Sequence, residues 1–178
     1  RVVIQGLIEK EKLNGAGGIL VAITGDRWQV RLDGKGRWLF KSVHLMKVEV
    51  PVVNIRQYKV GMVGTFDKWK GVHEMKWDEE CKCYHYEIKL GDDKEESFQV
   101  LMDGDWERCL HPDINDANPY SAYNLLGPDG KGHQKNWTIG KHACDKAAVG
   151  ARYRVSLSVT EDGCPKKINW SRLAEESA

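Results

Sequence analysis

Trp69 and Trp106, both at positions typical of turns, are the side chains of this sequence best suited to bind a ligand. An indole ring stacks on the apolar C–H face of a pyranose sugar, and it equally anchors a protein–protein interface. Four polar residues near them are suited to hydrogen-bond sugar hydroxyls or to form the rim of an interface: Asp67, Lys68, Gln99 and Asp105. The residue types therefore predict a binding site. They do not decide whether its ligand is a sugar or a protein.

Three further tryptophans, Trp28, Trp38 and Trp170, lie in segments where apolar and polar residues alternate. Aromatic side chains in half-buried strands usually pack against neighbours on the pleated surface. We therefore expect these three side chains to be part of a hydrophobic core rather than of a binding site.

No pattern in the sequence predicts catalysis. It contains neither a Gly-x-Ser-x-Gly elbow nor a His-Glu-x-x-His motif. The adjacent carboxylates Glu79–Glu80 and Glu95–Glu96 are expected in charged turns as solvated residues, and since adjacent residues of a strand face opposite ways, neither pair is placed for acid–base work. The Gly127–Gly132 segment has a proline and an aspartate where a phosphate-binding loop needs free N–H groups, and it is predicted to be a turn. We expect a non-catalytic protein without a cofactor.

Cys81, Cys83 and His85 alternate along a predicted strand and would offer zinc ligands on one face of it. Ligands at alternate positions of a flat strand are about 7 Å apart, too far for bonds of about 2.1–2.3 Å to one ion. We therefore expect no metal site.

The five cysteines are Cys81, Cys83, Cys109, Cys144 and Cys164. An odd number leaves at least one thiol unpaired within the chain. Disulfides between Cys144 and Cys164, or between Cys109 and either Cys81 or Cys83, are the alternatives. The count does not identify the cellular compartment.

The composition restricts the class of protein. Hydrophobic residues make up 41% of 178 residues, enough for a real core, so disorder is not expected. Lys and Arg number 27 against 26 Asp and Glu, so neither sign of charge is in marked excess. This balance argues against nucleic acid or anionic membranes as partners.

No apolar run approaches the roughly 18–20 residues of a membrane-spanning helix. A first residue that is Arg1 rather than Met predicts a processed or truncated chain.

Period-2 alternation and glycine-rich turns predict an all-β protein of two modules. We expect a small barrel over residues 1–49, a short packed linker over 50–57, a β-sandwich over 58–173 and a frayed tail over 174–178. The barrel strands are expected at Val2–Ile4, Gly18–Ile23, Trp28–Leu32, Trp38–Lys41 and His44–Val48.

The strands of the sandwich are expected at Tyr58–Gly64, Cys83–Leu90, Ser97–Met102, Trp137–Ile139, Tyr153–Thr160 and Lys167–Trp170. A long loop, rich in Asp, Asn, Pro and Gly, is expected over 107–136. Loops of this length inside a domain are usually functional or disordered, and we expect a functional one.

The first module resembles SH3-like barrels with the pattern gLxxxxLNGxxGxv followed by gRWxVrL. The matching residues are Val2–Leu7, Leu13–Gly15, Gly18, Arg27–Leu32 and Leu39–Leu45. The resemblance implies a small docking barrel that works beside other domains and has no chemistry of its own.

The second module contains Val-Gly-Thr-Phe-Asp-Lys-Trp at Val63–Trp69 and Phe-Gln-Val-Leu-Met-Asp-Gly-Asp-Trp at Phe98–Trp106. These motifs resemble, in order, the GSFNxW and YKFxVDGxW motifs of starch- and glycogen-binding modules. The resemblance implies an immunoglobulin-like antiparallel β-sandwich in which Trp69 and Trp106 face an α-glucan chain. Gln99 stands where these modules have a lysine, and no Asn-Asn pair follows at the expected place.

Beyond Trp106, four segments resemble a repeat domain of predicted dinoflagellate-type algal proteins: Gly127–Gly132, Asn136–Ile139, Tyr153–Val155 and Ile168–Trp170. This resemblance assigns no activity. It implies an organelle protein, such as an added subunit of a plastid complex.

We therefore expect a peripheral accessory or structural subunit of a larger assembly, such as a plastid photosynthetic membrane complex. It would dock through protein–protein contacts and have no membrane-spanning segment of its own. The alternative is an α-glucan-binding module, for starch or glycogen, that uses Trp69 and Trp106.

Overall fold

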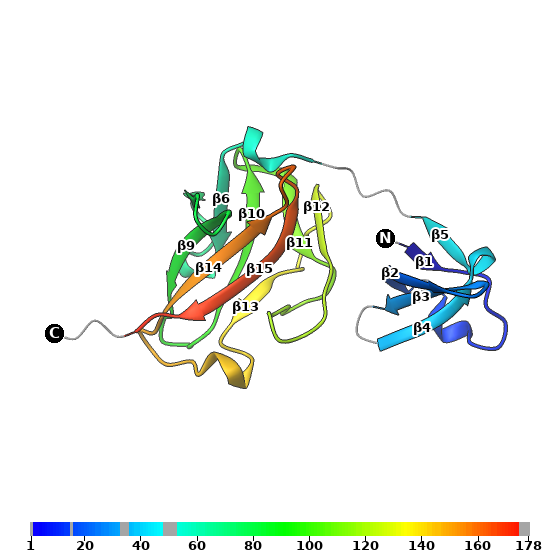
Figure 1. Ribbon diagram of the computed structural model, residues 1–178. Coiled ribbons are helices and arrows are strands. Elements are labelled where there is room, and N and C mark those ends of the chain that lie inside the picture. The colour runs from blue at the N-terminus through cyan, green and yellow to red at the C-terminus, as the bar shows by residue number, and fades with distance from the viewer. Residues whose placement is uncertain (1, 15, 33–35, 48–52, 175–178) are drawn as a thin grey trace. The chain divides into compact units, whose positions relative to one another are not determined.

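The protein is all-β, as predicted, and divides into two compact units, Arg1–Val52 and Val53–Ala178 (Figure 1). The computed structural model describes residues 2–14, 16–32, 36–47 and 53–174. Within these ranges all pairings between the named strands are antiparallel, and no helix is longer than the three residues of a 3-10 turn.

The first unit contains one sheet of five strands in the order β4-β3-β2-β1-β5. The strands are β1 (Val2–Ile4), β2 (Gly17–Thr24), β3 (Arg27–Leu32), β4 (Gly36–Lys41) and β5 (Leu45–Lys47). All five were predicted, but His44 belongs to the 3-10 helix η2 (Ser42–His44), and Val48 lies outside the described residues. Val30, Leu32 and Phe40 are buried in the core of this unit, and Trp28 and Trp38 pack against it, as expected.

The second unit contains two sheets that share one core. One has the order β12-β11-β10-β6-β7, with β13 also paired to β10, and the other has the order β15-β14-β9-β8. The bounds of the first sheet are β6 (Val60–Gly64), β7 (His73–Glu74), β10 (Glu96–Met102), β11 (Asp105–Pro112), β12 (Leu125–Asp129) and β13 (Trp137–Ile139). Those of the second are β8 (Lys76–Asp78), β9 (Cys83–Lys89), β14 (Arg152–Val159) and β15 (Pro165–Arg172).

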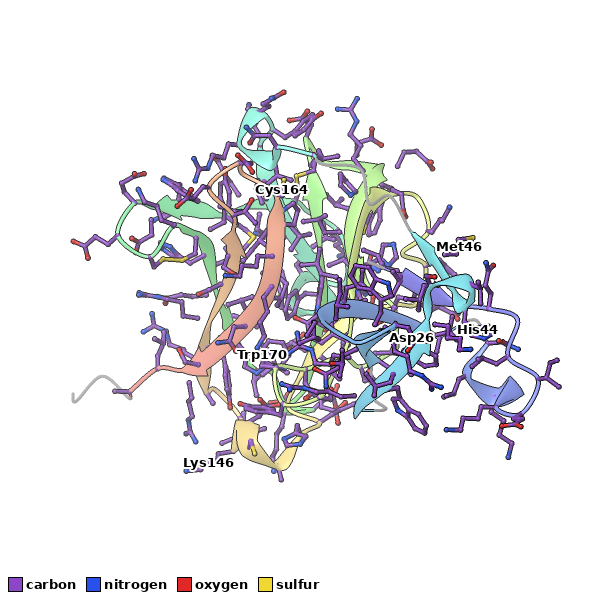
Figure 2. All side chains as sticks on the ribbon, turned by 45° about the vertical axis from the view of Figure 1, so that its right-hand side comes forward. Asp26, His44, Met46, Lys146, Cys164 and Trp170 are labelled. Carbon is purple, nitrogen blue, oxygen red and sulfur yellow. A yellow bond between two sulfur atoms is a disulfide. The ribbon has the colours of Figure 1, made fainter. Side chains whose placement is uncertain are left out.

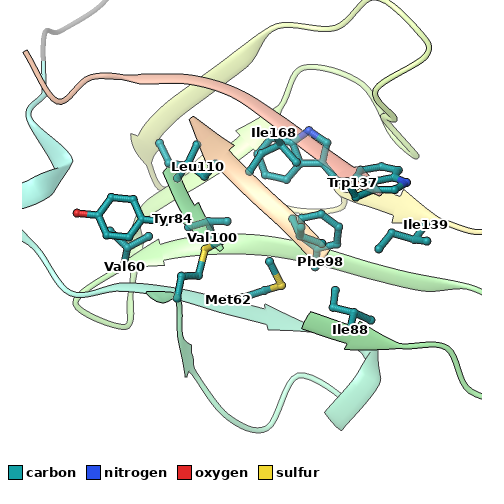
Figure 3. Close-up of a cluster of buried hydrophobic side chains, with 14 of the residues drawn as sticks. Val60, Met62, Tyr84, Ile88, Phe98, Val100, Leu110, Trp137, Ile139 and Ile168 are labelled. Atoms are coloured by element: carbon teal, nitrogen blue, oxygen red, sulfur yellow. The ribbon is translucent and has the colours of Figure 1, made fainter. Parts of the chain in front are cut away.

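Aromatic rings from both sheets meet in this core (Figure 3). Phe98 on β10 stacks on Trp137 of β13 with ring centroids 5.8 Å apart. Trp170 on β15, labelled in Figure 2, meets the Phe98 ring edge-on at 5.9 Å. Trp170 is therefore a core residue, as expected from its strand.

The predicted loop over 107–136 is wrong in part, because strands β11 and β12 occupy Asp105–Pro112 and Leu125–Asp129. There is a physical reason why the sequence pattern does not predict β11 and β12. β11 begins with charged residues, and β12 contains a glycine and a proline, so neither has the alternation of an independent strand. Their pairing with β10 and with each other forms them. The short strands β7 and β8 were missed as well.

The segment expected to be a linker, 50–57, lies partly outside the described residues. Its described end forms the 3-10 helix η3 (Ile55–Gln57), which the side chain of Asn54 caps by accepting a hydrogen bond from the Arg56 N–H. Ile55 is buried in the core of the second unit, so this end of the segment belongs to that unit.

The cysteine pairing also differs from the expected alternatives. Cys81 bonds to Cys83, whose Cα atom is 5.3 Å away, while Cys109, Cys144 and Cys164 are free thiols. The turn before β9 brings two nearly adjacent cysteines together. With Cys81 and Cys83 in a disulfide, the zinc ligand set considered for this strand is not formed.

The two units have opposite net charges, which the near-neutral whole chain conceals. Residues 1–52 contain nine Lys or Arg and five Asp or Glu, a formal charge of +4, and the remaining residues have a formal charge of −3. The expectation of no asymmetry of sign is therefore wrong at the level of the units. Part of the positive charge lies on the hairpin formed by β3 and β4, where Arg31 pairs directly with Arg37.

Arg31→Glu is expected to stabilise the protein by about 0.5 kcal/mol, because like charges opposite each other on neighbouring strands are destabilising and opposite charges are favourable. Urea unfolding followed by circular dichroism measures the change, since urea leaves ionic strength unaltered. Arg31→Gln is the control and should give a smaller gain. A loss of stability in Arg31→Glu would contradict the assigned strand register.

Candidate ligand-binding site

A cavity of about 500 Å³ lies on the second unit over the face of β10 that points away from the core. Alternation along β10 explains the position. Phe98 and Val100 point into the core, whereas Gln99 and Leu101 point to the opposite face of the sheet. The volume is within the range of about 300–1,000 Å³ that is usual for small-molecule sites.

Trp69 forms one wall of the cavity and is held there by an unusual backbone. After the 3-10 helix η4 (Thr65–Asp67), Lys68 and Trp69 both adopt left-handed conformations, with φ of 62° and 61°. The Trp69 N–H donates to the Gly64 carbonyl at 2.8 Å, and its ring packs over a small apolar cluster that includes Leu101. Left-handed backbone at two successive non-glycine residues is costly and is concentrated at functional sites.

Trp106 lines the cavity beside Trp69. The β10–β11 hairpin turns through Asp103 and Gly104, whose φ values of 56° and 70° are typical of a type I′ turn. Leu101 then pairs with Cys109 but Met102 pairs with Asp105, so the three residues 106–108 have no partner on β10. This bulge directs Trp106 outward. Its side chain is 49% exposed, and its ring centroid is 6.3 Å from that of Trp69.

The floor of the cavity is polar and well ordered by hydrogen bonds. Gln99 is buried, and its Nε2 donates to the carbonyl oxygens of Gly132 and Lys135, the latter at 2.8 Å. The thiol of Cys109 donates to Gln99 Oε1 at 3.4 Å. A Cβ atom on Gly132 would be 3.1 Å from Cys109 Sγ, so a glycine allows the 130–136 segment to approach the sheet this closely. Gln99 thus holds this segment against the sheet.

Three of the six predicted site residues line the cavity together: Trp69, Trp106 and Gln99. The other three do not. Asp67 Oδ2 is 2.8 Å from His73 Nε2 and also accepts the Gly71 N–H, and the hydrogen bond from His73 lowers the pKa of this carboxyl group.

Lys68 is exposed and serves as a turn residue beside Trp69. The Asp105 carboxylate accepts the Glu107 N–H at 2.9 Å and lies 3.6 Å from Arg108 Nε. Neither side chain lines the cavity.

Four polar lining residues were not predicted: Glu107, His133, Gln134 and Asn136. All four fall within the segment 107–136 that was expected to be functional, but the sequence did not indicate which of its side chains would face the tryptophans. Glu107 is the single carboxylate among the described lining residues. The cavity thus offers amide, imidazole and carboxylate groups for hydrogen bonds but no pair of carboxylates for acid–base hydrolysis.

Among the described residues, no group of three or more His, Cys, Asp or Glu side chains is placed to hold a metal ion. In the same part of the chain, no helix has the length and apolar character needed to cross a membrane. Comparisons with protein-family models, with curated proteins and with solved structures found no match to this chain.

Gln99→Leu is expected to destabilise the protein by about 2 kcal/mol, because it leaves the Lys135 carbonyl without the Gln99 donor and removes one of two donors from the Gly132 carbonyl, which also accepts the Lys135 N–H. Urea unfolding measures the loss. The control is Gln57→Leu, the same change at an exposed position of the same unit, which should shift stability by less than about 0.5 kcal/mol. Equal effects at the two positions would mean that Gln99 does not hold the 130–136 segment.

Burial raises the pKa of the Cys109 thiol to about 12, and the neighbouring Asp129 carboxylate adds to the rise. Since the thiolate is the reactive form, iodoacetamide should leave Cys109 unmodified in the folded protein between about pH 8 and pH 10. The exposed Cys144 is the internal control and should be alkylated. Peptide mass spectrometry identifies the modified thiols, and rapid native-state labelling of Cys109 would contradict the described burial.

Proposed function

We propose that the second unit binds an α-glucan chain without catalysing its cleavage, in the cavity lined by Trp69 and Trp106. The proposal rests on the contact between these two indole rings. Their centroids are 6.3 Å apart, although Trp69 and Trp106 are 37 positions apart in the sequence. Two adjacent rings in the lining of a cavity give the apolar C–H faces of successive sugars two surfaces for contact.

The polar lining supports a sugar as the ligand. Hydroxyl groups need donors and acceptors in a concave site, and a small number of placed polar groups fixes the orientation of a ligand. Gln134 and Asn136 supply side-chain amides, and Glu107 supplies an acceptor. Because Gln99 holds the 130–136 segment on the sheet, two of these groups sit on a restrained backbone. A restrained site loses less conformational freedom on binding.

We extend the proposal to the fold: the first unit is an SH3-like barrel, and the second is an immunoglobulin-like sandwich of the glucan-binding-module type. The two tryptophan motifs support this: the first begins at the end of β6 and continues through η4, the second runs along β10 into β11, and Phe98 pairs with Gly64. Gln99, in place of the modules' lysine, lines the cavity. Asn136 supplies an asparagine there, although the Asn-Asn pair is missing.

The accessory-subunit function, with a plastid photosynthetic complex as the assembly, stays a prediction. The observation that favours docking to another protein is the exposure of large apolar side chains on the first unit, among them Ile8 at 87% and Val43 at 72%. Exposed apolar groups beside charged ones are typical of interaction surfaces.

Maltoheptaose binding to the full chain, measured by isothermal titration calorimetry, tests the glucan proposal. Trp106→Ala should weaken binding at least tenfold, about 1.4 kcal/mol, through loss of one stacking surface. Because this side chain is half exposed, the melting temperature should change little. Trp106→Phe, which keeps an aromatic ring, should restore much of the affinity.

Lys68→Ala is the matched control, since Lys68 adjoins Trp69 in sequence but does not line the cavity, and it should bind as the unaltered protein does. Cellohexaose, whose glucose units are joined by β-linkages, tests whether binding depends on the α-linkage of the glucan. The proposal is wrong if the unaltered protein binds no maltoheptaose, or if Trp106→Ala binds it equally well.

A further inference from the structure

The outward face of the β3–β4 hairpin carries two cross-strand pairs of cations. Arg27 pairs with Lys41 and Arg31 with Arg37, and all four side chains are exposed. None of the four makes a hydrogen bond or an ion pair with another described residue. The opposite face of the hairpin carries Val30, Leu32 and Phe40 into the core, so the position of the cations is fixed by the register.

An exposed apolar side chain lies in the middle of these cations. Leu39 pairs with Gln29, between the two cation pairs, and is 46% exposed. Arg37, Leu39 and Lys41 therefore follow one another at alternate positions of β4, about 7 Å apart. We call Arg27, Arg31, Arg37, Leu39 and Lys41 the basic face.

Strand β4 is an edge of its sheet, because among the described strands it pairs with β3 alone. An edge strand presents unpaired N–H and C=O groups to which another extended chain can add. A groove of about 440 Å³ adjoins it, lined by residues 38–41 and by residues 6–10 with the exposed Ile8. Lys10 lies over the Trp38 ring, 4.7 Å from its centroid, and with Arg27 and Lys41 outnumbers Glu9, the one carboxylate among the described residues that line this groove.

We propose that the basic face and the edge of β4 bind an extended acidic peptide, which adds to the sheet as a further strand. Cross-strand neighbours on one face interact in pairs, and side chains on that face recur at every second residue. The peptide that fits has acidic residues opposite Arg37 and Lys41 and an apolar residue between them opposite Leu39. Its sequence pattern is therefore acidic-x-apolar-x-acidic.

The side chains around the cations favour a peptide over a nucleic acid. Binding of single-stranded nucleic acid combines cations with exposed aromatic rings on which bases stack. The large apolar side chains that the structure exposes on this unit are aliphatic or methionine: Ile8, Leu20, Val21, Ile23, Leu39, Val43 and Met46. Trp28 and Trp38 are half-buried and pack against the core, and the ring of Trp38 that lines the groove has Lys10 over it. Aliphatic groups next to cations complement a peptide that alternates carboxylates with apolar residues.

Fluorescence anisotropy of a short fluorescein-labelled peptide, in which glutamate, threonine and leucine follow this pattern, tests the inference on the full chain. The peptide should bind, and binding should weaken as salt screens the charges. Arg37→Glu combined with Lys41→Glu should weaken binding at least tenfold. Arg37→Gln with Lys41→Gln, a milder change at the same exposed positions, should weaken it less.

Lys166→Glu in the second unit is the matched control, an equal charge reversal at an exposed strand position, and it should leave binding unchanged. A peptide methylated at every backbone nitrogen keeps its charges but has no N–H group left to pair with an edge strand, so it should bind at least tenfold more weakly. Circular dichroism checks that each variant is folded.

The inference is overturned by any of three results: no binding of the peptide, equal binding of the methylated peptide, or binding of polyuridine RNA in its place through the same cations. Self-association of the chain that Arg37→Glu with Lys41→Glu abolishes would also overturn it, in favour of a second copy as the occupant. Trp106→Ala should leave peptide binding unaltered, so this inference and the glucan proposal can fail separately.

Discussion

Strand β10 places alternate side chains on opposite faces of its sheet, and both the core and the candidate site depend on that alternation. Phe98 and Val100 pack into the shared core of the second unit, where Phe98 meets the rings of Trp137 and Trp170. Gln99 points the other way and forms the polar floor of the cavity. Since β6, β11 and β13 all pair with β10, a slip of one residue would exchange these faces and remove both features together.

The walls of the cavity come from departures from regular structure around this strand. Trp69 follows a turn in which two successive residues are left-handed, and Trp106 lies in a bulge after a tight hairpin. The segment that carries Asn136 is held on the sheet by the side chain of Gln99. Regular strands thus provide the rigid support, and turns and a bulge direct the side chains that would contact a ligand. This division suits a binding site whose walls come from separate segments.

The two units differ in the ligands for which they are suited. The first has a net positive charge and exposes aliphatic side chains beside cations on an edge strand, which is suited to an acidic peptide. The second has a net negative charge and contains a cavity lined by two tryptophans, where we propose that a neutral sugar binds. A net charge of +1 for the whole chain conceals this difference, because charges of opposite sign cancel in the sum. A protein that binds a glucan by one unit and a protein partner by the other would combine the two functions that the sequence left as alternatives.

The sequence by itself determined the all-β class, most of the long strands and the candidate residues Trp69, Trp106 and Gln99, because alternation and turn residues are local properties of the chain. Only the tertiary structure decided that β11 and β12 occupy much of the expected loop, that Asp67 turns to His73 while Glu107 lines the cavity, and that Cys81 bonds to Cys83. It also decided that Arg31 lies opposite Arg37. These features depend on strand register, on a bulge and on turn geometry. Such properties arise when separate segments pair, and no single segment encodes them.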